Sequence, residues 1–448
     1  MRQFEIDKYL KKFESAEVNE FLPFKGVSID SRTIKKGEIF IGLKGENFDG
    51  NLFAERAAAN GASLLILDNE EVFKKINYPK VLVKNSLIAL KEIGGSCLSE
   101  FGGKLICITG SAGKTTAKKM VSDVLNSKYK VFTAYKNYNN EIGVALNAAN
   151  LDLDAEYAVF EIGTNNPGEI ELLAKYLSPD VSIITNIGKS HIGRFKSIEN
   201  IAKEKLTLLN YTKKVSYLYE NCLNFIGNSA DIIVSYGISE NNSAVISDIY
   251  REGNKLNFSI KYKDKKYNLQ LNHIYRHFVY NATAAAILGL DEGLEIRDIQ
   301  YALKNFTPEE HRGNVIETGV LTIVDDTYNC SFESLVEAIK NFSELNNAKK
   351  YAIVGEMAEI EGFEDEFYEK IYNLACSLKG IQFTFFGEKY KKYDENGYIE
   401  IITQKEKLLE RLSSINDGIV LLKASRSKKF DEYVDYLKTN TKRRSNAL

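Results

Sequence analysis

The sequence predicts an α/β protein with three domains. The chain has 448 residues, and because a domain has about 150 residues on average, about three domains are expected. Short apolar runs alternate with helical patterns over most of the length, which is typical of parallel sheets covered by helices. Two linkers are indicated, by the glycine pairs at either end of residues 94–103 and by the polar residues 307–314. The expected domains are residues 1–100, 101–310 and 311–448.

The composition is that of a soluble globular protein, with 44% hydrophobic and 27% charged residues. The net charge of −2 gives no sign of a nucleic-acid partner, and no apolar run has the length of a membrane span, so we expect no membrane insertion. Residues 1–13 are too charged for a secretory signal, and we expect a cytoplasmic protein with reduced thiols. The five scattered cysteines, which lack the spacing of metal ligands, are Cys97, Cys107, Cys222, Cys330 and Cys376.

The first 100 residues alternate short strands and helices. Residues 27–32 and 37–45 have the pattern of strands, and the alanine-rich residues 52–62 that of a helix. Three polar residues at or just after the predicted strand ends are Ser31, Arg32 and Lys44. Arginine and lysine at such positions can bind a diphosphate. A solvated loop is the alternative, and composition alone favours it.

Residues 104–120 have the pattern of a phosphate-binding loop. An apolar strand at 105–109 is followed by a helical pattern. Between the strand and the body of the helix lie Gly110, Ser111, Ala112, Gly113, Lys114, Thr115 and Thr116. Glycines let backbone N–H groups surround an anion, the lysine supplies charge for the outer phosphates, and a threonine hydroxyl can ligate Mg²⁺. The general loop has a further glycine where this chain has Ile108, and a chance Gly-Lys-Thr is the alternative to the ATP site that we predict.

Three polar residues accompany the next two predicted strands. Glu161 lies within the apolar run 158–164. Asn186 lies near the end of the run 182–188, and His191 follows shortly after. Ligands bind at the carboxyl ends of strands in an open parallel sheet. Since a glutamate in a buried strand needs a cation or an ion-pair partner, we interpret Glu161 as a metal ligand, with a structural salt bridge as the alternative.

The helical pattern at 197–209 contains a lysine in its apolar face. Lys205 occupies the position that would complete the apolar stripe, whereas Lys203 and Glu204 are predicted to point elsewhere. A lysine at the edge of such a stripe can extend its ammonium to water. A desolvated lysine can instead be an anchor or be covalently modified. Periodicity leaves both alternatives open.

The remaining chain continues the α/β alternation after an insertion. Residues 246–271 have the pattern of antiparallel hairpins, and the alanine-rich helix at 277–290 carries His277 and Asn281 on one face of its first turn. In the last domain polar residues again follow the predicted strands, so we expect this domain to face a ligand too. Candidate ligand-facing residues are Arg312 in the second linker and Asp326 at the end of the run 321–329.

Together these segments resemble the Mur ligases, which are ATP-dependent amide-bond ligases of bacterial cell-wall synthesis. The resemblance runs from about residue 27 to 437 in the same order. Its motifs are residues 30–50, 108–116, 161–170, 185–195, 325–329, 354–360 and 421–426. Within the family, residues 161–170 and 185–195 are most similar to the members that add D-alanyl-D-alanine to UDP-N-acetylmuramoyl-tripeptide. The resemblance implies an N-terminal substrate domain, a central P-loop ATPase domain, a Rossmann-like C-terminal domain, and use of ATP and Mg²⁺.

The resemblance also implies roles for the matching residues. The catalytic residues would be Lys114, Glu161, His191 and Lys205, the last as a carbamate that bridges Mg²⁺. The other metal ligands would be Thr115, Glu161 and His191. Beyond the loop 110–116, the residues that contact ATP would be Asn186, Asn281, Arg312 and Asp326. The UDP-linked muramoyl peptide would be bound by Ser31, Arg32 and Lys44, with a D-alanyl-D-alanine-like amine as second substrate and a monomeric enzyme.

Several positions depart from the family pattern. They are Asn51, Tyr275, Phe278, Cys330, Ser331, Phe332 and Ala424. The ATP site is expected to survive these changes, but the last domain helps to hold the amine. A second hypothesis is therefore a diverged ligase with another carboxylate or amine. A third, a non-catalytic nucleotide sensor, is disfavoured because Lys114, Glu161 and Lys205 are retained.

Overall fold

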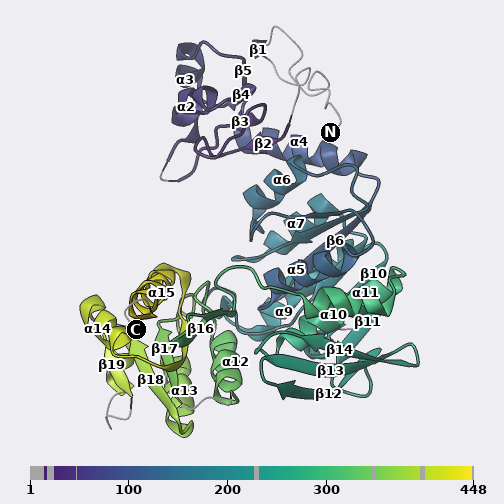
Figure 1. The fold of residues 1–448 in the computed structure, drawn as a ribbon. Coiled ribbons are helices and arrows are strands. Elements are labelled where there is room, and N and C mark those ends of the chain that lie inside the picture. Colours follow the sequence, from purple (N-terminus) through teal and green to yellow (C-terminus); the bar gives the residue numbers. More distant parts are fainter. Residues whose placement is uncertain are drawn as a thin grey trace.

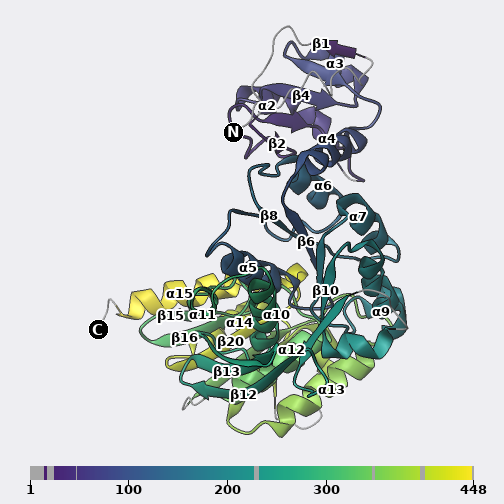
Figure 2. The same cartoon turned by 90° about the vertical axis from the view of Figure 1, so that its right-hand side faces the viewer.

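The computed structural model describes residues 15–17, 25–46, 48–226, 232–345, 349–393 and 399–445. They form three α/β units, each with its own sheet (Figure 1), so the predicted fold class is confirmed. In Figures 1 and 2 the N-terminal unit stands at one end, while the central and C-terminal units lie side by side. The segment 1–13, on which the prediction about a secretory signal was based, lies outside the described residues.

The N-terminal unit has a five-stranded sheet with β1 antiparallel to its neighbour and the other strands parallel. In spatial order the strands are β1 (Ser15–Glu17), β5 (Lys80–Leu82), β4 (Leu64–Leu67), β3 (Ile39–Ile41) and β2 (Val27–Ser28). Its helices are η1 (Gly50–Phe53), α2 (Ala54–Ala59), α3 (Glu70–Lys75) and α4 (Ser86–Glu100). The strands predicted at 27–32 and 37–45 are shorter than expected.

The first linker is shorter than predicted. Gly94 and Gly95 lie inside α4 rather than in a connection, which is left with residues 101–103. A Cβ atom on Gly94 would lie 2.4 Å from the Tyr176 hydroxyl and 2.8 Å from the carbonyl of Ala145. Here glycine allows α4 to pack closely on the central unit, a requirement that the sequence pattern cannot distinguish from a flexible joint.

The central unit has a nine-stranded sheet. In spatial order its strands are β14 (Lys265–Leu271), β13 (Lys255–Tyr262), β12 (Ala244–Glu252), β11 (Ile233–Gly237), β10 (Val215–Tyr219), β9 (Val181–Ile184), β6 (Lys104–Thr109), β8 (Tyr157–Glu161) and β7 (Val131–Thr133). The hairpins predicted at 246–271 are confirmed as β12–β14, which pair antiparallel and extend a parallel sheet. The strand β6 lies between β8 and β9, so their carboxyl ends converge.

Helices pack against this sheet. They are α5 (Lys114–Leu125), α6 (Glu141–Ala149), α7 (Glu169–Leu177), α8 (Ile192–Phe195), α9 (Ile198–Leu206), η2 (Thr207–Tyr211), η3 (Glu220–Phe225), α10 (Phe278–Asp291) and α11 (Ile296–Lys304). None of the helices in the described ranges is long and apolar enough to cross a membrane.

The C-terminal unit has a six-stranded sheet that is parallel apart from its edge strand β15. The spatial order is β15 (Asn314–Glu317), β16 (Leu321–Asp325), β20 (Gly418–Lys423), β17 (Lys350–Gly355), β18 (Ile381–Phe386) and β19 (Glu400–Ile402). Its helices are α12 (Phe332–Ser343), α13 (Glu364–Ser377), η4 (Glu388–Tyr393), α14 (Lys405–Ser413), η5 (Arg426–Lys428) and α15 (Asp431–Ser445).

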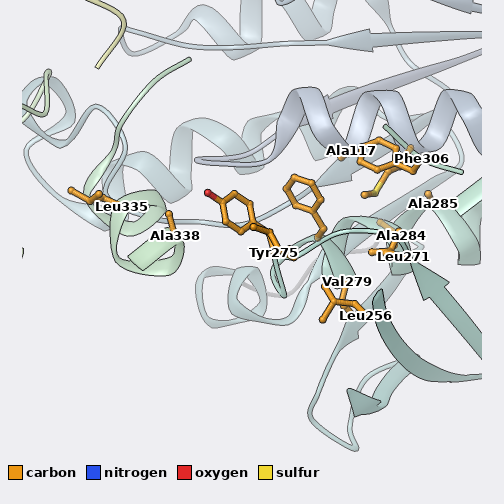
Figure 3. Packing of buried hydrophobic residues seen from close by; sticks show 14 of the residues in the cluster. Ala117, Leu256, Leu271, Tyr275, Val279, Ala284, Ala285, Phe306, Leu335 and Ala338 are labelled. Atoms are coloured by element: carbon orange, nitrogen blue, oxygen red, sulfur yellow. The ribbon is translucent and has the colours of Figure 1, made fainter. Parts of the chain in front are cut away.

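One hydrophobic core continues from the central into the C-terminal unit. Figure 3 shows Tyr275, just before α10, between Phe306 of the central unit and Leu335 and Ala338 of α12. Its hydroxyl donates to Asp326 Oδ2 at 3.3 Å, across the boundary between the two units. The family departure at Tyr275 is thus a buried interdomain contact, which holds the C-terminal unit against the central one.

Candidate active site

The loop between β6 and α5 has the conformation of a phosphate cradle. Gly110 and Gly113 have φ of 150° and 79°, values that favour glycine. A Cβ atom on Gly113 would lie 2.9 Å from the side-chain amide nitrogen of Asn281, which is buried at the start of α10. Lys114 Nζ donates to the carbonyl of Gly110 at 2.8 Å. The structure therefore brings Asn281 to the predicted loop.

The end of β9 supports this loop from beneath. Asn186 Oδ1 accepts from the backbone N–H of Ala112 at 2.9 Å, and Thr185 Oγ1 donates to the Ala112 carbonyl at 2.6 Å. Ser111 Oγ donates to the carbonyl of Gly188 at 2.9 Å. Asn186 thus shapes the loop through its own side chain, and Thr185 is a further supporting residue that sequence reasoning did not single out.

Glu161 lies directly beside the loop. Its side chain is 2% exposed, and Oε2 accepts from the Thr115 hydroxyl at 2.8 Å. Oε1 accepts from Asn139 Nδ2 at 2.7 Å. Within the described ranges no cationic side chain pairs with Glu161, so the alternative of a structural salt bridge is not supported. Asn139 was missed as a site residue, although the polar run 135–140 preceding α6 was visible in the sequence.

Lys205 lies in the apolar stripe and is buried, with 1% of the residue exposed, which decides between the two alternatives that periodicity left open. The ammonium does not reach water, so burial lowers the pKa of Lys205 well below its ordinary value, and the charge of Lys114 lowers it further. Among the described residues, no hydrogen bond or ion pair to this ammonium is found. Its neighbour Glu204 is also buried, contrary to the prediction, because it accepts from the backbone N–H groups of Gly168 and Ile170, each at 2.8 Å.

Lys114 and Lys205 are thus two cations in one poorly solvated region. Desolvation also lowers the pKa of Lys114, while Glu161 opposes that shift. A buried ammonium without a counter-ion is costly, so an uncharged or anionic form of Lys205 is favoured. The lysine that extends to water is therefore not supported, which leaves the desolvated lysine as an anchor or a modified residue.

His191 meets the C-terminal unit at this site. The imidazole Nδ1 lies 2.7 Å from Oε2 of Glu359, which belongs to the connection after β17. The neighbouring imidazole lowers the pKa of Glu359, although Nδ1 is not aligned for a hydrogen bond. Glu359 is also among the charges that act on Lys114, which places it in the electrostatic neighbourhood of the phosphate loop.

Arg312 and Asp326, which the resemblance implies contact ATP, lie at the domain boundary. The Arg312 guanidinium stacks on the Tyr328 ring, 3.8 Å from its centroid, and its charge contributes to lowering the pKa of Lys114. Asp326 Oδ2 accepts from Lys423 Nζ at 2.7 Å. Arg312 is therefore near the loop already, whereas the Asp326 carboxylate is engaged with a buried lysine.

The three predicted residues of the N-terminal unit are not brought to the loop in the described part of the chain. Arg32 is exposed and forks onto the carboxylate of Asp30, with the closest contact at 2.7 Å. This hydrogen bond lowers the pKa of Asp30 to about 2. Lys44 is exposed, and Ser31 is buried with its carbonyl accepting from Asn60. Arg32 and Lys44 are both exposed, which is compatible with a diphosphate-binding site and with a solvated loop.

Comparison with known proteins gives the family. A family model described as the Mur ligase middle domain matches residues 108–289, and one described as the Mur ligase family, catalytic domain, matches residues 23–94. A UDP-N-acetylmuramoyl-tripeptide–D-alanyl-D-alanine ligase of Bacillus subtilis is 31% identical over 427 residues, which cover 91% of this chain and 92% of that protein. The chain belongs to the Mur ligase family. It is accordingly an ATP-dependent ligase.

Other relatives and solved structures of this family agree with that assignment. The ligase of the same name from Escherichia coli is 26% identical, with 92% of this chain and 94% of that protein covered. The structure of MurF from Acinetobacter baumannii has a TM-score of 0.85 at 23% identity and covers 98% of this chain and 99% of that one. The MurF ligase of Thermotoga maritima in complex with ADP has a TM-score of 0.80 at 25% identity, covering 95% and 100%. The predicted resemblance is confirmed.

Proposed function

We propose that this Mur ligase joins D-alanyl-D-alanine to UDP-N-acetylmuramoyl-tripeptide at the expense of ATP, as a cytoplasmic monomer. The printed names of the relatives support this substrate pair, and one of the related structures was solved with ADP. The observation that carries the proposal is the contact of Thr115 with Glu161 next to Lys114, whose charge acts on the buried Lys205. A phosphate loop with this carboxylate and lysine suits phosphoryl transfer to a carboxylate.

In the first step, a carboxylate oxygen of the muramoyl peptide attacks the γ-phosphorus of ATP. A bond forms between that oxygen and phosphorus while the bond to ADP breaks, which gives an acyl phosphate. Lys114 neutralises charge on the transferred phosphoryl group, and the loop glycines bring backbone N–H groups close to the phosphates. Thr115 and Glu161 hold one another in a fixed geometry beside it.

In the second step, the amine nitrogen of D-alanyl-D-alanine attacks the acyl carbon. The carbon–oxygen bond to phosphate breaks and the nitrogen loses a proton, which leaves an amide and inorganic phosphate. The charges of Arg312 and Glu359 act on Lys114, so closure of the C-terminal unit over the loop would exclude water that hydrolyses the acyl phosphate.

The donor set near the loop fits Mg²⁺. Thr115 and Glu161 supply hydroxyl and carboxylate oxygens, the ligands that Mg²⁺ prefers, and a carbamate on Lys205 with His191 would supply more. Mg²⁺ typically takes only one or two protein carboxylates and completes its coordination with water and substrate phosphates. No group of three or more histidine, cysteine, aspartate or glutamate side chains within the described ranges forms a metal site by itself. Bound Mg²⁺ would neutralise charge on the phosphates.

Phosphate release from ATP, measured across pairs of UDP-muramoyl peptides and amines, tests this proposal. We expect release only when both the tripeptide and D-alanyl-D-alanine are present, with the UDP-muramoyl-pentapeptide as product. Tripeptides with different third residues should be compared. Release with another carboxylate or amine alone would favour the diverged ligase, which the departures at Cys330, Ser331 and Phe332 motivate. Nucleotide binding without release in every pair would favour the sensor.

A further inference from the structure

Lys118 is a buried cation that the steps of the proposed reaction do not use. It lies on α5, one helical turn after Lys114 of the phosphate loop, and its exposed fraction is 0%. Lysine is almost never fully buried unless its ammonium is paired. Nζ donates to the backbone carbonyls of Ala134, at 2.9 Å, and of Lys136. It also lies 3.5 Å from Oε1 of Glu309, so two carbonyls and a carboxylate surround the ammonium.

The two carbonyls belong to the loop 134–140, which connects β7 to α6. The loop buries little aromatic surface, since Tyr135 is 60% exposed and Tyr138 is 39% exposed. Lys136 has φ of 49°, a left-handed conformation that costs free energy for a residue with a Cβ atom and needs support from its surroundings. The loop therefore depends on polar contacts, and those to the Lys118 ammonium are of the stronger, charge-assisted kind.

A neutral anchor holds the same loop from α6. Asn147 Oδ1 accepts from the backbone N–H of Tyr135 at 2.7 Å, while its Nδ2 donates to the carbonyl of Gly143 at 2.9 Å. Because this anchor is independent of Lys118, loss of the lysine should loosen the loop without unfolding it.

The far end of the loop contacts the acid beside the phosphate cradle. Three residues after Lys136, Asn139 Nδ2 donates to Oε1 of Glu161 at 2.7 Å. The carbonyl of Asn139 accepts from the backbone N–H of Gly163 at 2.8 Å, and a Cβ atom on Gly163 would lie 2.8 Å from Cγ of Asn139. The amide is thus closely fitted, and a shift of the loop would move it away from the Glu161 carboxylate.

We propose that Lys118 is a positioning residue, which anchors the loop 134–140 so that Asn139 holds the Glu161 carboxylate in place beside Thr115. Lys118 acts through Asn139 and needs no contact with a substrate. The inference rests on the proposed function only in taking Glu161 as a carboxylate that faces the cation of the bound nucleotide.

Hydrogen exchange of the loop and Mn²⁺ binding test this role. Lys118→Met removes the ammonium from a side chain of similar length. Backbone amides of residues 134–140 should then exchange faster, as measured by mass spectrometry. Mn²⁺ binding in the presence of ADP, followed by the electron paramagnetic resonance of the free ion, should weaken several-fold. The loss should not exceed that of Asn139→Ala, which we expect to be about 10-fold.

Two further variants separate positioning from folding. Lys118→Gln keeps a neutral donor, so it should lose less in both measurements, and it takes the place of Lys118→Met if that variant does not fold. The matched control is Lys80→Met in the N-terminal unit. Lys80 is also buried and donates to two carbonyls, those of Phe73 and Ile76. Lys80→Met should leave Mn²⁺ affinity and exchange of the loop unchanged even where it lowers stability.

A double-mutant cycle shows whether Lys118 acts through Asn139. In an Asn139→Ala background, Lys118→Met should have no further effect on the Mn²⁺ dissociation constant. Unchanged exchange or unchanged Mn²⁺ affinity in Lys118→Met, or equal losses in Lys80→Met, would overturn the proposal. Glu161→Ala shows whether the proposed function fails as well. Full Mn²⁺ affinity in that variant would mean that Glu161 does not face the cation, whereas a loss there without one in Lys118→Met would overturn the positioning role alone.

Discussion

The hydroxyl of Thr115 donates a 2.8 Å hydrogen bond to the carboxylate of Glu161. The two residues lie 46 positions apart, one after β6 and the other at the end of the adjacent strand β8. Because these strands are parallel, their carboxyl ends place the phosphate loop and the acid together. The parallel sheet therefore places the phosphate loop next to Glu161, and the side chains around the loop then fix its conformation.

Lys114→Ala should reduce phosphate release by at least about 100-fold, since it removes the charge that faces the transferred phosphoryl group. The fold should persist, because the hydrogen bond found for this lysine among the described residues goes to the Gly110 carbonyl in its own loop. Phosphate release and far-UV circular dichroism measure the two effects. The matched control is Lys119→Ala on the same helix, whose lysine pairs with Asp123 instead, and it should retain activity.

Lys205→Ala should lower turnover by about 100-fold or more if the buried lysine acts as a carbamate. Short carboxylic acids added to the variant should restore part of the phosphate release, since they supply the missing anion. Lys203→Ala, which changes an exposed lysine in the same helix, should behave like the unmodified protein. Full activity in Lys205→Ala would exclude the carbamate.

Local pattern was sufficient for the residues whose role is set by their own element. Glycine spacing predicted the loop, and helical periodicity placed Lys205 in the apolar stripe, since both depend on a few neighbouring residues; periodicity did not decide whether the ammonium reaches water. Local pattern did not distinguish the environments of the neighbouring residues Lys118 and Lys119. Lys118 is fully buried and donates to the carbonyls of Ala134 and Lys136, whereas Lys119 pairs on the surface.

Residues whose role lies in a tertiary contact were not predicted. Glu359 belongs to a recognised segment, but nothing in its sequence places it against His191, which lies in another unit. Gly94 was interpreted as part of a linker because close packing and chain flexibility both require glycine. Such contacts depend on the relative placement of distant elements.

Asn139→Ala should lower turnover about 10-fold, because the amide orients the Glu161 carboxylate from the side opposite Thr115. The apparent affinity for Mg²⁺ should fall with it, which steady-state rates at varied Mg²⁺ will measure. Asn140→Ala is the contrasting variant. It removes the cap of α6, so it should lower stability by about 1 kcal/mol with little effect on Mg²⁺ dependence.

Gly113→Ala should destabilise the protein by about 1–2 kcal/mol, because φ of 79° is unfavourable for a residue with a Cβ atom. The new methyl group would also lie 2.9 Å from the Asn281 side-chain amide, so that side chain must move away from the loop and nucleotide affinity should fall. Chemical denaturation and ADP binding measure the two effects. Gly168→Ala has a similar φ of 91° but no atom within 4 Å of the added Cβ, so it should show the strain without the loss of affinity.

His277 makes the stability of the protein depend on pH. Burial, together with the charge of Lys423, lowers the pKa of His277 to about 3 in the folded protein, and its Nδ1 has no hydrogen-bond partner in the described ranges.

The unfolded chain has an ordinary histidine pKa of about 6.5. Below that value the unfolded chain binds a proton at His277 that the folded chain does not. The contribution of His277 to the free energy of unfolding is therefore fully present above pH 6.5 and falls by about 1.4 kcal/mol per pH unit below it. The loss reaches about 2 kcal/mol at pH 5 from this residue alone.

His277→Gln should therefore reduce the difference in unfolding free energy between pH 8 and pH 5 by about 2 kcal/mol, measured by chemical denaturation. Because the free energy of unfolding is compared between pH 8 and pH 5 within each protein, an effect of the glutamine that is the same at both pH values cancels. A second buried histidine, His273, also has its pKa lowered to about 3, so part of the pH dependence should remain. An unchanged difference would mean that His277 binds its proton equally well in the folded and unfolded chain.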